Sequence, residues 1–126
     1  MAEWIWSKVA RWAVADALLA EINAAYAEYV GPFVRADGTP VPIADRITAV
    51  ASARVVPWLY ISGDYVVVTK VPDRFAAVMT LKAFANMVGG IYWESEGAVL
   101  VKLATLVSFI ESRKTEIETL LAQSGQ

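Results

Sequence analysis

The sequence predicts an α+β fold in which a long N-terminal helix and a short helix precede two ββα units. Three observations support this prediction. A long run near the N-terminus lacks glycine and proline, two pairs of apolar runs are each interrupted by a glycine-containing turn, and a helical pattern follows each pair. The two hairpins would form a four-stranded antiparallel sheet with helices on one face. At 126 residues, the chain is expected to be a single domain, residues 1–126.

The first helix is predicted at residues 2–30, which are rich in Ala, Leu, Glu and Trp and are followed by Gly31 and Pro32. One side of this helix carries large apolar residues: Trp4, Leu18, Leu19, Ile22, Tyr26 and Tyr29. Another side carries a strip of small residues: Ala10, Ala13, Ala17, Ala20, Ala24 and Ala27.

The small-residue strip would let a second helix approach closely. The candidate interface consists of residues from the strip and from its upper end: Trp6, Val9, Ala13, Ala17, Ala20 and Ala24. A second copy of the chain could cover it, or the domain itself could cover both sides of the helix.

Residues 31–45 hold three prolines and two glycines, which indicates a loop, either a contact arm or a plain linker. A bend is expected at Asp37 and Gly38. Asp45 is then placed to cap a short helix at residues 46–53. The shared apolar face of that helix is Ile47, Val50 and Ala51.

The first hairpin is predicted at residues 55–71, where β-branched and aromatic residues flank Ser62, Gly63 and Asp64. Pro57 cannot donate to a ladder, so its strand should lie at a sheet edge or begin only at Trp58.

The next helix is expected at residues 73–88, capped by Asp73 and ended by Gly89 and Gly90. Apolar side chains occupy most of its circumference, which predicts burial on most sides. Its narrow polar edge is Arg74, Lys82 and Asn86.

A second hairpin is predicted at residues 91–101, turning at residues 95–97, and an amphipathic helix at residues 104–121. At an offset of 33 residues, Val66 aligns with Val99 and Val68 with Val101. The two ββα units are therefore either a repeat or alike by chance.

The chain has no Cys and no His, which removes the commonest nucleophiles, general bases and metal ligands. It also lacks phosphate-binding and nucleophile motifs, so no cofactor, metal or catalytic residue is predicted. Glu94 and Glu96 could share a strand face, but they are expected to be solvated turn residues. The exception would be their burial with Lys70 or Lys102. The sequence therefore predicts that the protein is not an enzyme.

The net charge of −2 and the pI near 5.1 argue against a large phosphate-gripping surface. Even so, basic residues gather in the middle of the chain: Arg46, Arg54, Lys70, Arg74 and Lys82. They suggest an alternative function, a small winged-helix-like nucleic-acid-binding module with residues 74–88 as recognition helix and residues 93–97 as wing. The apolar helix and the acidic wing count against it.

Apolar residues make up 57% of the chain and the mean hydropathy is +0.46, which indicates more apolar surface than one small core needs. No stretch reaches about 18 uninterrupted apolar residues, so no membrane span is expected. Glu3 and Asp16 also argue against a secretion signal. We therefore expect a cytoplasmic, non-catalytic structural or protein-interaction protein that forms a homo-oligomer, in the first instance a dimer. Scarce amides and the absence of Cys are typical of heat-adapted proteins, whereas a charged fraction of 19% is not.

Three stretches, MAEWIWSKVARWAVADALLAEI, YISGDYVVVTKV and IYWESEGAVLVKL, resemble small proteins of the spherical viruses of hyperthermophilic crenarchaea, the globuloviruses. The resemblance is one of general style and length. It implies a viral protein in the host cytoplasm or the virion and assigns no role to any residue. The order of helix, hairpin, helix and strands is also similar to that of roadblock-type dimerisation domains.

Overall fold

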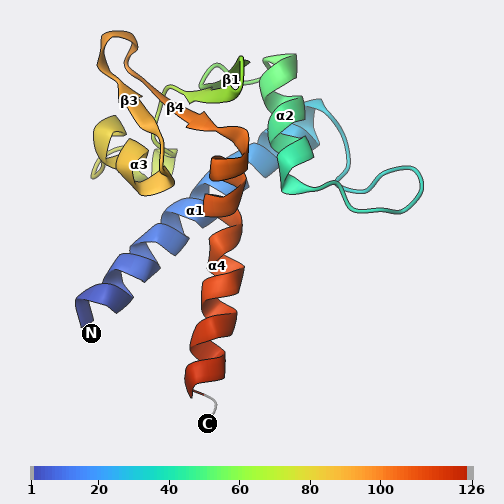
Figure 1. The fold of residues 1–126 in the computed structure, drawn as a ribbon. Coiled ribbons are helices and arrows are strands. Elements are labelled where there is room, and N and C mark those ends of the chain that lie inside the picture. Colours follow the sequence, from blue (N-terminus) through green and yellow to red (C-terminus); the bar gives the residue numbers. More distant parts are fainter. Residues whose placement is uncertain (1, 125–126) are drawn as a thin grey trace.

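The computed structural model describes residues 2–124, with side chains for residues 8–123, and its strands form one antiparallel sheet (Figure 1). The strands are β1 Leu59–Ser62, β2 Tyr65–Val68, β3 Ile91–Trp93 and β4 Ala98–Lys102. They lie in the order β1-β2-β4-β3, so the second strands of the two hairpins pair at the centre. The predicted α+β class with a four-stranded antiparallel sheet is confirmed.

The α-helices of the described chain all contribute to the same core. They are α1 Ala2–Tyr29, α2 Ile43–Ala53, α3 Leu81–Val88 and α4 Leu103–Ser124. One fully buried residue from each helix illustrates this: Leu18, Ile47, Phe84 and Leu106. The strands add alternate residues to the same cluster: Leu59, Val66, Val68, Val99 and Val101. Because alternate residues of a strand point to opposite faces, the helices cover one face of the sheet.

The end of α1 lies where the sequence predicts it. The backbone N–H groups of Val30 and Gly31 both donate to the Tyr26 carbonyl at 2.9 Å. The following loop contains the predicted bend, with Gly38 at a φ of +90°. The hydroxyl and the backbone N–H of Thr39 donate to the Asp37 carboxylate, and these bonds lower the pKa of Asp37.

Asp45 does not cap α2, contrary to the sequence prediction. The helix begins at Ile43 with Pro42 at the N-cap position, and no side chain bonds the cap. Pro42 has an extended backbone, as an N-cap residue usually does, and its carbonyl accepts the N–H of Arg46. Asp45 instead lies in the first turn and pairs with Arg35 of the loop.

The prediction of a single buried helix at residues 73–88 is also wrong. Residues Asp73–Phe75 form one 3-10 turn (η1), and α3 begins only at Leu81. Thr80 caps α3 by accepting a hydrogen bond from the N–H of Ala83 at 3.1 Å, whereas Asp73 caps no helix. The break leaves Val78 80% exposed, so this segment is not buried on most sides.

Both hairpins form as predicted. β1 lies at a sheet edge and begins at Leu59, after Pro57, and Gly63 with a φ of +59° makes the first turn. A 3-10 turn, η2 Glu94–Glu96, followed by Gly97 joins β3 to β4.

The offset of 33 residues has a counterpart in the central strand pair. Val66 pairs with Val101, and Val68 pairs with Val99. At this offset Val66 corresponds to Val99 and Val101 corresponds to Val68, so the two pairs are equivalent. The correspondence does not extend to the whole ββα unit. The longer second turn shifts β3 by two positions relative to β1, and α3 is much shorter than α4.

Candidate functional site

The face of the sheet that points away from the helices is apolar. Tyr60, Val67, Leu100 and Ile91 form one row across all four strands. The apolar members of this face, called the outer sheet face from here on, are Tyr60, Tyr65, Val67, Ile91, Trp93, Ala98 and Leu100, and Ser62 and Lys102 lie on the same face at the ends of β1 and β4.

Burial agrees with this assignment of faces. Val67 and Ala98 are each only 1% exposed, yet neither joins the core cluster formed with the helices. On the outer sheet face, their neighbours Tyr60, Tyr65 and Leu100 are half-buried. At its margin, Ile91 is 61% exposed and Trp93 is 42% exposed.

Charged groups lie at the edges of this face. Lys102, opposite Tyr65, is the only charged residue in β1 to β4. The guanidinium of Arg54, at the end of α2, lies 6.0 Å from the ring of Tyr60. An antiparallel sheet with one solvated face usually alternates apolar and polar residues, and this sheet does not.

The predicted α1 interface is only partly open. Val9 is 40% exposed, and Ala20 and Ala24 are exposed, but Ala13 is half-buried and Ala17 is only 8% exposed. The side chain of Trp6 lies outside the described residues.

The segment before and within η1 lies beside the middle of this helix. The Asp73 N–H donates to the Glu21 carboxylate at 2.8 Å, and Lys70 lies 3.9 Å from the same carboxylate. Asp73 and Arg74 line one small cavity together with Ala17 and Ala20. This part of the strip is therefore next to the chain's own residues.

The five basic residues proposed as nucleic-acid contacts do not form one surface. Arg46 packs 4.6 Å from the ring of Phe33 and donates to Asn23, so it has a structural role in the loop and α2. Lys70 pairs with two carboxylates. Arg46 lies in α2 and Arg54 directly follows it, whereas Lys82 belongs to α3 on the opposite side of the fold (Figure 1). Arg74 lies in η1.

Glu94 and Glu96 lie exposed in the turn η2. They are not buried with Lys70 or Lys102, the arrangement that would have favoured an acid–base site.

A charged cluster joins α1 to α4. Lys8 lies 2.8 Å from the Glu116 carboxylate, and the indole N–H of Trp12 donates to its other oxygen. Burial disfavours the charged form of Glu116, but the bonds from Lys8 and Trp12 and the charges of Lys8 and Arg11 outweigh it, so the pKa of Glu116 is lowered.

This lowered pKa predicts a pH-dependent contribution to stability. The ionised carboxylate stabilises the fold above the ordinary pKa of 4.5, and this contribution is lost as the pH falls through the lower pKa of the folded state. We expect Glu116→Gln to cost roughly 1–2 kcal/mol of unfolding free energy at neutral pH, with little difference from the wild type in strong acid.

Urea unfolding at several pH values measures this difference, with Glu118→Gln as the matched control, because Glu118 is an exposed residue of the same helix. A deficit of Glu116→Gln that is the same at every pH would contradict the expectation.

Comparison with protein-family models, curated proteins and solved structures gives no match. The resemblance to globulovirus proteins, with the location and heat adaptation it implies, therefore stays a prediction. Within residues 2–124, none of the helices combines the length and the apolar content that crossing a bilayer requires.

The sequence-based site prediction missed the outer sheet face. The available signal was that the strands are apolar at successive positions, a pattern typical of sheets covered on both faces. The predicted helices were sufficient to cover only one face of the sheet.

Proposed function

We propose that the protein is a non-catalytic interaction protein that associates with a second copy of itself through the outer sheet face. The observation that carries this proposal is the row Tyr60, Val67, Leu100 and Ile91, an apolar row across four strands that lies outside the core cluster formed with the described helices. The exposed turn position of Glu94 and Glu96 supports the non-catalytic part.

A second copy is the partner that this surface fits best. A two-fold interface needs a self-complementary patch, and one flat apolar sheet matches another at a spacing of about 10 Å. Lys102, at the end of β4, is the only charged strand residue on this face, so the face carries little charge that would select a partner of opposite charge.

The size of the surface indicates the strength of the association. The four strands, of three to five residues each, span roughly 250 Å² in projection. Stable interfaces bury about 800 Å² on each partner, which is more than the outer sheet face alone provides. The face would therefore form the centre of an interface whose total buried area is small for a stable complex. We therefore expect reversible association in the micromolar range.

The test is sedimentation equilibrium across micromolar concentrations. We expect the wild type to dimerise and the double variant Ile91→Glu with Trp93→Glu to remain monomeric, since carboxylates would have to be desolvated in the interface. Both positions are exposed in the single chain, so an unchanged thermal unfolding midpoint of the monomer is the folding control.

The matched control is Ala20→Glu with Ala24→Glu, which places the same charges on exposed positions of α1. We expect this variant to dimerise like the wild type. A wild type that is monomeric throughout would reject self-association. If the Ala20→Glu and Ala24→Glu variant were monomeric and the Ile91→Glu and Trp93→Glu variant still dimerised, the interface would lie on the first helix instead.

A further inference from the structure

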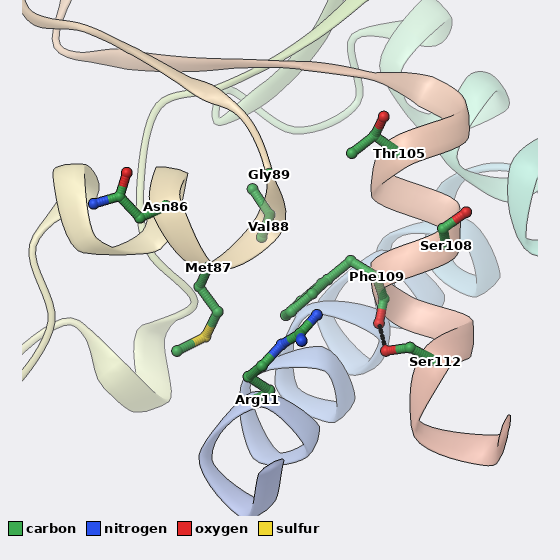
Figure 2. Close-up of a pocket in the computed structure, with 9 residues that line it drawn as sticks. All are labelled: Arg11, Asn86, Met87, Val88, Gly89, Thr105, Ser108, Phe109 and Ser112. Atoms are coloured by element: carbon green, nitrogen blue, oxygen red, sulfur yellow. Dashed lines mark hydrogen bonds between the residues drawn. The ribbon is translucent and has the colours of Figure 1, made fainter. Parts of the chain in front are cut away.

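A hollow of about 550 Å³ lies between α1, the end of α3 and the first turns of α4, on the helical side of the sheet. Figure 2 shows the side chains of Arg11 from α1 and Phe109 from α4 converging there, with Met87 of α3 facing them. The hollow is wide open to solvent, and its volume is comparable to that of small-molecule sites.

Arg11 is the unusual group in this hollow. Its guanidinium carbon lies 5.5 Å from the centre of the Phe109 ring, and its Nε is buried without a hydrogen-bond partner. No carboxylate of residues 8–123 forms an ion pair with it. The nearby Glu116 is held by Lys8 and Trp12.

The rest of the lining is free of acidic groups among the described residues. Thr105, Ser108 and Ser112 add hydroxyls from α4, and the Ser112 hydroxyl donates to the Phe109 carbonyl at 2.7 Å. Met87 and Phe109 give the hollow an apolar wall. A guanidinium stacked on an aromatic ring still has donors along its edge for an anionic group.

We propose that this hollow binds a small organic anion whose carboxylate or phosphate group pairs with Arg11 and whose apolar part packs on Phe109 and Met87. The forked donors of arginine match two oxygens of either group. The proposal is independent of self-association, because the hollow lies on the helical side and the outer sheet face on the other.

Two probes separate the possible anionic groups: benzoate carries a carboxylate and phenyl phosphate a phosphate. Benzamide is the neutral counterpart of benzoate. We would titrate each into the full chain by calorimetry and follow the Arg11 Nε–H resonance by NMR. We expect at least one anion to bind and to shift that resonance, whereas benzamide does neither.

Substitutions test whether the residues that line the hollow bind the anion. Arg11→Gln removes the charge, and Met87→Glu places a competing carboxylate beside Arg11, so each should weaken binding at least about tenfold. Lys82→Gln removes an exposed positive charge on α3 and should leave binding unchanged. The Met87 variant keeps the test valid if Arg11→Gln proves unstable.

Three outcomes would overturn the proposal. They are no binding of either anion at millimolar concentration, binding of benzamide as tight as that of benzoate, and undiminished anion binding by Arg11→Gln and Met87→Glu when both variants are folded.

Discussion

Phe84→Ala is expected to lower the free energy of unfolding by about 3–5 kcal/mol. Phe84 is fully buried and is the largest of the fully buried side chains. It lies on the inner side of α3 in the cluster that joins the helices to the sheet. Truncation removes its burial and leaves a cavity that the surrounding strands and helices can fill only in part.

The control for this prediction is Val78→Ala, which should change the unfolding free energy by no more than about 0.5 kcal/mol. Val78 lies only six residues before Phe84 but is 80% exposed. Urea unfolding of both variants gives the comparison. Similar large losses for the two would indicate that residues 73–88 form one buried helix and that the break before α3 is wrong.

That break shows what the sequence could and could not predict. Asp73 and Thr80 are both acceptable N-caps, and both precede apolar residues. Choosing between them depends on tertiary packing, because Phe84, Ala85 and Val88 can reach the core from a short helix.

The strands were easier to predict, because β-branched runs and glycine turns act locally. The pairing of β2 with β4 places Val66 beside Val101, a contact between distant parts of the chain. The sequence did not predict this pairing, because the alignment at an offset of 33 residues compared the two hairpins without placing them in the sheet.

The candidate sites depend on such distant contacts. The alanine strip of α1 can be recognised in the sequence. Nothing in the sequence shows, however, that the segment from Lys70 to Arg74 lies beside Ala17. Likewise, Arg11, Met87 and Phe109 come from three helices and share no local pattern. The surplus of apolar residues predicted an apolar surface for a partner but did not indicate where on the fold it lies.

Gly90→Ala is expected to destabilise the fold by about 2–3 kcal/mol, because this glycine permits a close approach of two chain segments. A Cβ at position 90 would lie 2.9 Å from the carbonyl oxygen of Leu100 and 2.9 Å from a methyl group of Val99. The oxygen belongs to the backbone of the central strand β4, so it cannot move aside without disturbing the sheet.

Gly89 and Gly90 therefore have different roles, although the sequence predicts both only as a helix end. Gly89 has a φ of +81° and ends α3, whereas Gly90 provides space against β4. The control is Gly97→Asn, at a φ of +60° with open space around it, where asparagine tolerates the left-handed backbone and should cost less than about 1 kcal/mol. Thermal and urea unfolding measure both variants. If Gly90→Ala were as stable as the wild type, β4 could not lie this close to residue 90, and the register that pairs Ile91 with Leu100 would have to shift.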